Sequence, residues 1–216
     1  MFENNQWIAL YFDAPLQSWG YQSRFRRRTT LGYPTKSGVI GLLGAALGIA
    51  RNDRVQIASL VELEMTVVVL KPPKRLQDYH TVGGGYDPKV NPRAVSITAE
   101  GASSDPVPTN REYLMEAKFG VLLTGPDYLL QNIRNALKDP CWGIWFGRKS
   151  CVPAMPILQG VFPSETSALD HLVKISGGAV HKTIKDVKAF EEGTDSLQDL
   201  PIDFQARLYS VRRIVE

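Results

Sequence analysis

The stretch KSGVIGLLGAALGI, residues 36–49, determines the first crossover of the predicted fold. Its large apolar residues recur at helical spacing, so we predict an amphipathic helix. The opposite side of this helix is unusually small and holds Gly38, Gly41, Gly44 and Gly48. Each glycine weakens a helix by roughly 0.5–1 kcal/mol relative to alanine. We therefore expect something to approach this side closely: a neighbouring strand, another subunit or an RNA backbone.

Strand patterns surround this helix. The run WIALYF is continuously apolar, as in a strand covered on both faces, and two longer segments alternate as half-buried strands do. The four strand candidates are residues 7–12, 62–70, 111–123 and 142–146. Pro126 opens a second helix, which Asp139 and Pro140 end. The order strand, helix, strand, strand, helix, strand predicts an α+β, ferredoxin-like fold, which RNA-recognition domains also use.

The two central strand candidates are joined by an unusually long connection, residues 71–110, with six prolines and a triple glycine. Loops beyond about 12–15 residues in a compact domain are usually functional or disordered. Residues 76–82 and 93–99 have the pattern to pair across the glycine-rich turn as a projecting hairpin. We therefore predict a thumb, with a passive flexible insertion as the alternative.

We predict one ferredoxin-like domain over residues 1–150, with residues 71–110 as its thumb insertion. Residues 151–216 are predicted to be a smaller, less regular extension packed on the same domain. In this extension we expect a strand over residues 156–162, a helix capped by Ser164, a loop-rich stretch over 177–200 and a last strand over 202–214.

Positive charge is concentrated near one end of the chain. The net charge is only +3, yet no Asp or Glu occurs between Ala14 and Asn52. The same stretch holds Arg24, Arg26, Arg27, Arg28, Lys36 and Arg51. Such a cluster predicts an anionic partner. A solvated basic loop is the alternative.

Aromatic residues are interleaved with these arginines. The segment PLQSWG, residues 15–20, is followed by Tyr21, Phe25 and Tyr33. Aromatic faces stack on unpaired bases with roughly 1–3 kcal/mol per base, and guanidinium groups bind phosphates in a bidentate way. The combination predicts a single-stranded nucleic acid, although Trp19 or Phe25 can instead fill the core.

Two further segments suggest phosphate binding. In GYPTKSG, residues 32–38, a basic residue and a hydroxyl lie at a helix N-terminus, which suits an anion. A Walker loop is excluded because Thr30 and Thr35 stand where it needs glycine. In GRKSC, residues 147–151, two adjacent cations and a hydroxyl follow a strand candidate and suit a phosphate clamp.

A catalytic centre is weakly indicated. His80, in DYHT, is a candidate general acid or base, but His171 and His181 lie in less patterned surroundings. Cys141 and Cys151 are ten residues apart without a nearby histidine pair, so they form no zinc signature. We expect no metal and no cofactor.

Targeting signals are not evident in this sequence. No apolar run approaches the ~20 residues that span a bilayer. The opening MFENNQW has an acid and no base before its first apolar run, unlike a secretory signal. Two cysteines are too few for a disulfide framework, so we expect reduced thiols. We expect a cytoplasmic protein without a membrane partner.

Five segments, in this order, resemble the CasD (Cas-five) family of type I-E CRISPR Cascade, within the RAMP superfamily. They are PLQSWG (15–20), YPTKSGVIGLLGAALGI (33–49), DYHTV (78–82), REYL (111–114) and GRKSC (147–151). The resemblance covers roughly the first 160 residues. It implies a non-catalytic subunit that grips the 5′ handle of the CRISPR RNA and caps the backbone filament.

The resemblance also implies partners and contact residues. The partners would be the CRISPR RNA, the Cascade backbone subunit and the large PAM-reading subunit, with target DNA nearby through the guide duplex. The implied handle contacts are Gln17, Trp19, Arg24, Arg26, Arg27, Arg28, Lys36 and Ser37. A second set comprises Arg148 and Lys149, with Tyr79, His80 and Thr81 near the thumb base.

Three alternatives stay open at this point. The first is a metal-independent endoribonuclease that processes precursor CRISPR RNA, as in type I-C systems; a lysine–histidine pair is expected there, whereas Tyr79 precedes His80. The second is a generic RNA-recognition module, whose aromatic pattern is missing from both central strand candidates. The third is a purely structural subunit.

Overall fold

A large sheet organises the structure. The computed structural model describes residues 6–23, 26–82 and 107–216. The strands of the sheet are β1 (Trp7–Asp13), β6 (Glu64–Lys71), β9 (Lys118–Thr124), β10 (Leu158–Phe162), β11 (Lys182–Val187), β12 (Asp195–Asp203) and β13 (Leu208–Val215). They lie in the order β10-β1-β9-β6-β11-β13-β12, and every neighbouring pair is antiparallel.

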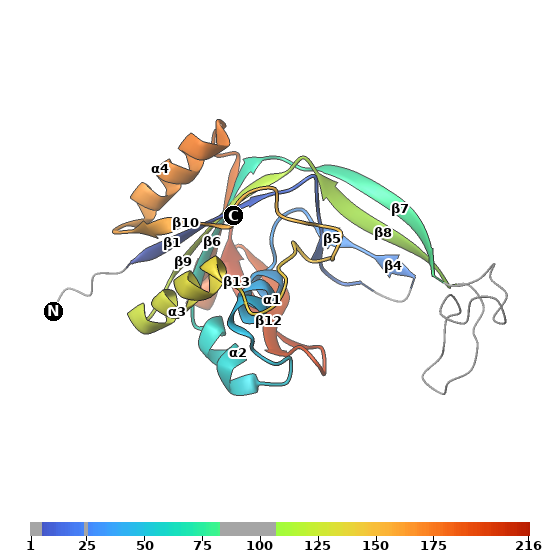
Figure 1. Ribbon diagram of the computed structural model, residues 1–216, viewed down its shortest axis with the longest axis horizontal. Coiled ribbons are helices and arrows are strands. Elements are labelled where there is room, and N and C mark those ends of the chain that lie inside the picture. The colour runs from blue at the N-terminus through green and yellow to red at the C-terminus, as the bar shows by residue number, and fades with distance from the viewer. Residues whose placement is uncertain (1–5, 24–25, 83–106) are drawn as a thin grey trace.

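Helices cover both faces of this sheet (Figure 1). The helices are α1 (Lys36–Leu47), α2 (Arg54–Val61), α3 (Asp127–Lys138) and α4 (Glu165–Ser176), with a short 3-10 helix η2 (Phe190–Glu192) before β12. Along β1, Ile8 and Leu10 join the core under α1–α3, while Ala9 and Tyr11 face Leu172 of α4. Because β1 is buried on both faces, its sequence is continuously apolar.

Most local predictions from the sequence are confirmed. The strands over residues 7–12, 62–70 and 156–162 and the helices at residues 36 and 126 are all present. Ser164 caps α4 as predicted, since its Oγ accepts a hydrogen bond of 3.1 Å from the amide of Ser167. These elements have strong signals in their own sequence.

Other predictions are wrong. The run 111–123 is not one strand: β8 (Val107–Met115) ends before Glu116, which has a left-handed φ of 58°, and β9 follows. Residues 142–146 form a loop, and the ring centroid of Phe146 lies 4.7 Å from that of Phe12 in the core. The stretch predicted as loop-rich, 177–200, contains β11 and the start of β12. Helix α2 was not predicted, although Asp53 caps it.

A long two-stranded ribbon extends away from the sheet (Figure 1). β7 (Lys74–Val82) pairs antiparallel with β8 along its whole length. Residues 76–82 therefore pair with β8, while the predicted pairing with residues 93–99 stays a prediction. Residues 93–99 themselves lie outside the described residues. We call this pair of strands the β7–β8 ribbon.

Side chains of the protein itself approach the glycine side of α1. A Cβ atom on Gly38 would lie 2.8 Å from Cε3 of Trp19. Gly48 ends the helix with a left-handed φ of 74°, and a Cβ there would lie 2.8 Å from Sγ of Cys141. The close approach that the sequence predicts is thus made, in part, within this chain. No helix in the described ranges is long and apolar enough to cross a membrane.

We expect Gly38→Ala to lower the free energy of unfolding by about 1–3 kcal/mol, because the added methyl group overpacks the core. The methyl group would meet Trp19 and also Oγ1 of Thr35, at 2.9 Å. Urea unfolding measures the change.

Gly44→Ala is the matched control, because a Cβ there has its nearest neighbour, Cβ of Ile49, at an ordinary 3.8 Å. This variant should gain about 0.5–1 kcal/mol from its better helix propensity. Equal stability of the two variants would contradict the packing of Trp19 on Gly38.

Candidate nucleic-acid interface

The arginine-rich loop lies against the β7–β8 ribbon. β4 (Arg27–Arg28) pairs in parallel with β8, so that Arg27 lies beside Asn110 and Arg28 beside Arg111. The amide of Asn110 donates a hydrogen bond of 2.8 Å to the carbonyl of Arg26. The three consecutive arginines are exposed. The backbone pairing therefore presents three cations along the ribbon.

Two predicted contact residues support this loop from inside. Gln17 and Trp19 are 0% and 1% exposed. Gln17 Nε2 donates to the carbonyls of Phe12 (3.1 Å) and Ala117 (3.0 Å), and Trp19 Nε1 donates to Gln17 Oε1 at 3.2 Å. Their polar groups are satisfied within the chain, so neither side chain offers a surface to a ligand. The alternative that Trp19 fills the core is the one observed.

Arg148 connects the arginine loop with the ribbon. Its Nη1 donates to the carbonyl of Glu112 at 2.9 Å and its Nη2 to the carbonyl of Arg28 at 3.1 Å. Its guanidinium lies 4.4 Å from the ring centroid of Tyr113, a favourable cation–π geometry. Lys149, the next residue, is exposed. The GRKSC segment therefore adds charge to the same surface.

A groove of about 740 Å³ opens on one face of the ribbon. Its charged and titratable lining comprises Asp78, His80, Arg111, Arg148 and Lys149. A second hollow of about 370 Å³ shares Arg111 and Arg148 with it and reaches Arg28. Because the two hollows share these residues, they adjoin, and we call the two adjoining, mainly basic hollows the basic groove.

The residues predicted near the thumb base lie on two opposite faces of β7. His80 lines the groove, and its Nδ1 lies 3.9 Å from Oδ2 of Asp78. Side chains alternate along a strand, so Tyr79 and Thr81 project from the other face of β7. Tyr79 is 69% exposed there. The structure thus separates Tyr79 and Thr81 from His80.

Arg111 is a groove residue that the sequence analysis missed. It lies opposite Asp78 across the ribbon, and its Nε donates to Thr109 Oγ1 at 3.1 Å. The sequence could have indicated this residue, because Arg111 is the first residue of the REYL segment that carries the family resemblance. Arg24, by contrast, was predicted as a contact and lies outside the described residues.

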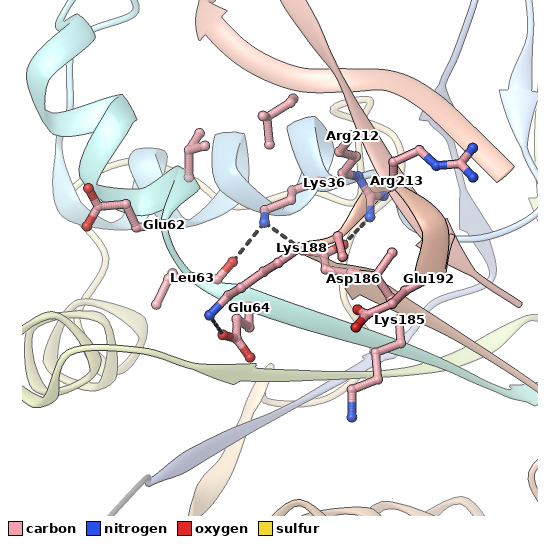
Figure 2. A pocket seen from close by; sticks show the side chains of 14 residues that line it. Lys36, Glu62, Leu63, Glu64, Lys185, Asp186, Lys188, Glu192, Arg212 and Arg213 are labelled. Carbon is pink, nitrogen blue, oxygen red and sulfur yellow. Dashed lines mark hydrogen bonds and ion pairs between the residues drawn. The ribbon is translucent and has the colours of Figure 1, made fainter. Parts of the chain in front are cut away.

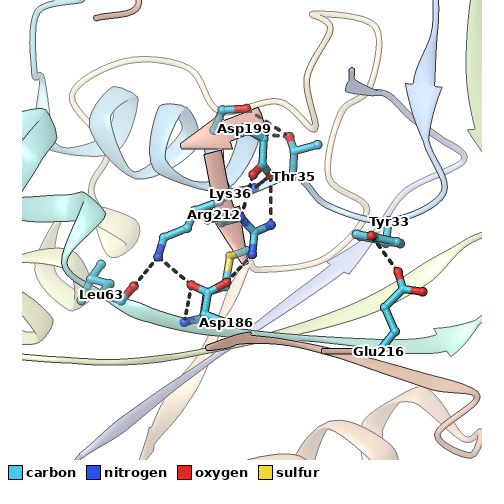
Figure 3. Close-up of polar contacts among 11 residues, drawn as sticks. Tyr33, Thr35, Lys36, Leu63, Asp186, Asp199, Arg212 and Glu216 are labelled. Carbon is cyan, nitrogen blue, oxygen red and sulfur yellow. Dashed lines mark hydrogen bonds and ion pairs between the residues drawn. The ribbon is translucent and has the colours of Figure 1, made fainter. Parts of the chain in front are cut away.

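Lys36 belongs to a buried ion network and not to the basic groove (Figure 3). Its Nζ lies 2.6 Å from Oδ2 of Asp186 and donates to the carbonyl of Leu63 at 2.8 Å. Its backbone amide donates to Oδ2 of Asp199 at 2.7 Å. Lys36 is 5% exposed. The buried partners explain why this lysine does not present its charge to an external phosphate.

Arg212 completes the network. Its Nε and Nη2 bond the carboxylate of Asp199, at 2.6 and 3.0 Å, and its Nη1 pairs with Asp186. Burial disfavours the charged guanidinium, but the hydrogen bonds and the attraction of Asp199 and Asp186 outweigh this and raise the pKa of Arg212. The network joins the start of α1 to β11, β12 and β13. Its role is to hold the fold together.

The cavity beside this network has mixed charge (Figure 2). Its volume is about 590 Å³, and Lys36, Asp186 and Arg212 form part of its wall. Lys188 Nζ lies 2.5 Å from Oε1 of Glu64 at the same wall. The lining includes Lys36, Lys185, Lys188, Arg212 and Arg213 with Glu62, Glu64, Asp186 and Glu192. Carboxylates repel phosphate, so this cavity suits RNA less than the basic groove does.

Ser37, Cys141 and Cys151 do not line the basic groove. Ser37 Oγ donates to Oγ1 of Thr35 at 3.3 Å, and its side chain is partly exposed. Cys141 is exposed and Cys151 is buried, and burial raises the pKa of the Cys151 thiol. Among the residues that the structure describes, no group of three or more His, Cys, Asp or Glu is placed to hold a metal ion.

Comparison with known proteins identifies the family. Residues 7–215 match the family described as CRISPR-associated protein (Cas_Cas5). The chain therefore belongs to the Cas5 family of CRISPR-associated proteins. Within the family, it is 31% identical over 166 residues to the CRISPR system Cascade subunit CasD of Escherichia coli (strain K12), covering 71% of this chain and 70% of that protein.

Solved structures agree with this assignment. A chain of a structure titled "CRISPR RNA-guided surveillance complex" matches with a TM-score of 0.78 and 33% identity, covering 97% of this chain and 88% of that one. A "Crystal structure of Cas protein" matches with a TM-score of 0.68 and 31% identity, covering 96% and 92%. The mixed α/β fold with its large antiparallel sheet is thus a Cas5 fold.

We expect Arg212→Met to lower the free energy of unfolding by about 3–5 kcal/mol, because it leaves buried carboxylates without their cation. The matched control is Arg213→Met, on the neighbouring residue. Arg213 donates to Ser196 Oγ (2.8 Å) and lies over the ring of Phe190. It also donates to the carbonyls of Phe190 (3.1 Å) and Gly193, and among the described residues it pairs with no buried carboxylate. Its removal should cost less, about 1–2 kcal/mol, because these groups lie near the surface. Equal decreases in chemical denaturation would refute the role of the network.

Proposed function

We propose that this chain is a non-catalytic RNA-binding subunit of a Cascade-type antiviral surveillance complex. It grips the 5′ handle of the CRISPR RNA and caps the backbone filament. Its membership in the Cas5 family supports this, as do the relatives named a Cascade subunit and a CRISPR RNA-guided surveillance complex. Family membership also displaces the alternative of a generic RNA-recognition module.

The basic groove is the observation that carries the proposal. Arg28, Arg111, Arg148 and Lys149 line its two adjoining hollows. Guanidinium groups suit phosphates, since they donate in a planar, bidentate way. Phosphate contacts position a nucleic acid and make its binding depend on salt. Of the predicted contacts, we keep Arg28, His80, Arg148 and Lys149 as groove residues, add Arg111, and keep Arg26 and Arg27 as exposed cations of the adjoining loop.

We infer that a ferredoxin-like unit underlies this groove. The order β10-β1-β9-β6, with α1 and α3 in the two crossovers, fits the split βαβ arrangement. Since β10 supplies the fourth strand, the unit extends to at least residue 162, and the domain boundary near residue 150 moves accordingly. The β7–β8 ribbon, inserted between β6 and β9, would be the thumb that lies across the guide.

The proposed partners follow from the same role. They are the CRISPR RNA, the adjacent backbone subunit and the large PAM-reading subunit, with target DNA close by through the guide duplex. We propose that the complex acts in the cytoplasm. No cofactor enters this proposal.

Processing of precursor RNA is the second candidate activity. His80 lies in the groove beside Asp78, which gives it the position of a general base. The lysine that the type I-C resemblance would require is replaced by Tyr79, on the other face of β7. We therefore propose binding without cleavage.

We expect Arg27→Ala/Arg28→Ala to weaken binding of a labelled RNA that copies the CRISPR RNA 5′ handle. The slope of log K against log salt should fall by about 0.7 for each phosphate that the variant no longer neutralises. Alanine keeps the backbone carbonyl of Arg28 to which Arg148 donates. Fluorescence anisotropy between low and high salt measures both quantities.

Lys138→Ala/Lys174→Ala removes the same charge from α3 and α4, which lie at the opposite end of the molecule from the ribbon (Figure 1). Both lysines are exposed. This control should bind RNA like the wild type. An arginine variant indistinguishable from this control would show that the loop does not contact phosphate.

His80→Ala should leave the 5′ ends of the bound RNA unchanged. The test is co-expression with a CRISPR array and the other Cascade subunits, followed by a pull-down on this chain and sequencing of RNA ends. Recovery of one repeat-derived 5′ handle from both proteins supports a non-catalytic subunit. Mature ends that appear only with His80 intact would establish the endoribonuclease instead.

A further inference from the structure

A separate hollow lies between the arginine loop and the C-terminal hairpin formed by β12 and β13. Its volume is about 540 Å³. Tyr21 and Arg28 line it from the loop, Ser37 from the first turn of α1, and Arg207 and Tyr209 from the hairpin. Segments far apart in the sequence thus build one concave site. Its volume lies in the range of about 300–1,000 Å³ that small-ligand sites occupy.

This hollow continues the basic groove. Arg28, with Gly20 and Ser23, lines both this hollow and the 370 Å³ hollow that contains Arg111 and Arg148. A strand of RNA that leaves the groove at Arg28 would therefore enter a hollow that the C-terminal hairpin also lines. We call this continuation the hairpin slot.

The charge of the hairpin slot favours an anion. Arg28 and Arg207 are exposed. The one carboxylate in the described lining, Asp199, has its two oxygens engaged by Arg212 and by the amide of Lys36. Its charge is therefore balanced within the buried network, and Arg28 and Arg207 dominate the field in the slot.

Tyr209 is held with part of its ring accessible. It packs edge-to-face against Phe204, with ring centroids 6.4 Å apart. Phe204 in turn packs toward Gly41 of α1, where a Cβ would lie 3.7 Å from its Cζ, and its amide donates to the carbonyl of Arg51 at 3.1 Å. A tyrosine phenol is neutral at physiological pH and does not repel phosphate, and burial raises the pKa of Tyr209 further. A fixed, half-buried aromatic ring is a suitable platform for a base.

We propose that the hairpin slot binds an unpaired nucleotide of the RNA strand held by the basic groove. Arg28 and Arg207 contact its phosphates, and Tyr209 stacks on its base. This assigns an RNA-binding role to the C-terminal hairpin, and it rests on the proposed function.

The test uses the full chain and the same labelled handle RNA. Tyr209→Ala should lower affinity by about 5- to 140-fold, the equivalent of roughly 1–3 kcal/mol for one stacked base. Tyr209→Phe should bind like the wild type, since it keeps the stacking face. Arg207→Gln should reduce the salt slope by about 0.7. Lys174→Gln, on α4, is the matched control and should change neither quantity.

The outcomes separate this proposal from the function on which it rests. If the arginine-loop variant binds RNA more weakly while Arg207→Gln and Tyr209→Ala bind like the wild type, the hairpin slot is wrong and the basic groove stands. If the wild type does not bind the RNA, the proposed function fails. If the hairpin variants bind RNA normally but no longer assemble with other Cascade subunits, the hairpin is a protein interface. Thermal melting identifies a variant that does not fold. If Tyr209→Ala does not fold, the salt slope of Arg207→Gln, a change at an exposed residue, decides whether the hairpin slot binds RNA.

Discussion

The buried network of Lys36, Asp186, Asp199 and Arg212 is the constraint on which the rest of the structure depends. Two carboxylates and two cations share a largely buried site, so each charge is tolerable only because the others are in place. The network fixes the start of α1 against β11, β12 and β13. It therefore sets the position of the arginine loop, which leads directly into α1, relative to the C-terminal hairpin.

The proposed RNA surface is built outward from this frame. Gln17 and Trp19 brace the loop from within the core, and Arg148 ties its outer part to the ribbon through two backbone carbonyls. Lys36 and Arg212 are buried and serve the structure, the exposed arginines of the loop are proposed to face the ligand, and Arg148 does both. Residue type alone does not distinguish the buried structural cations from the exposed ones. Lys36 is buried among carboxylates, whereas Arg28 lies on an exposed strand beside the ribbon.

What the sequence predicted correctly depended on local signals. Helix α1 was predicted from the helical spacing of its apolar residues, with its glycines on the opposite side. The start of α4 was predicted from Ser164 as its N-cap. The turn at Glu116 was missed because a non-glycine residue adopts the left-handed conformation there. The polar strand β11 was missed because its partner, the edge of β6, is distant in sequence. The burial of Lys36 was unpredictable for the same reason, since Asp186 and Asp199 are 150 and 163 residues away. The family resemblance supplied the function that these patterns alone left open.

The long sequence separation within the network has a consequence for biosynthesis. Domains usually acquire structure from the N-terminus as they leave the ribosome. Here the amide of Lys36 has no partner until Asp199 is synthesised. Asp186 and Asp199 have no guanidinium partner until Arg212, in β13, is synthesised. Until β11 emerges, the nascent chain carries an unneutralised lysine at the start of α1 and an unpaired edge along β6. Contacts of such long range slow folding, so the frame around α1 is completed only late in the synthesis of this chain.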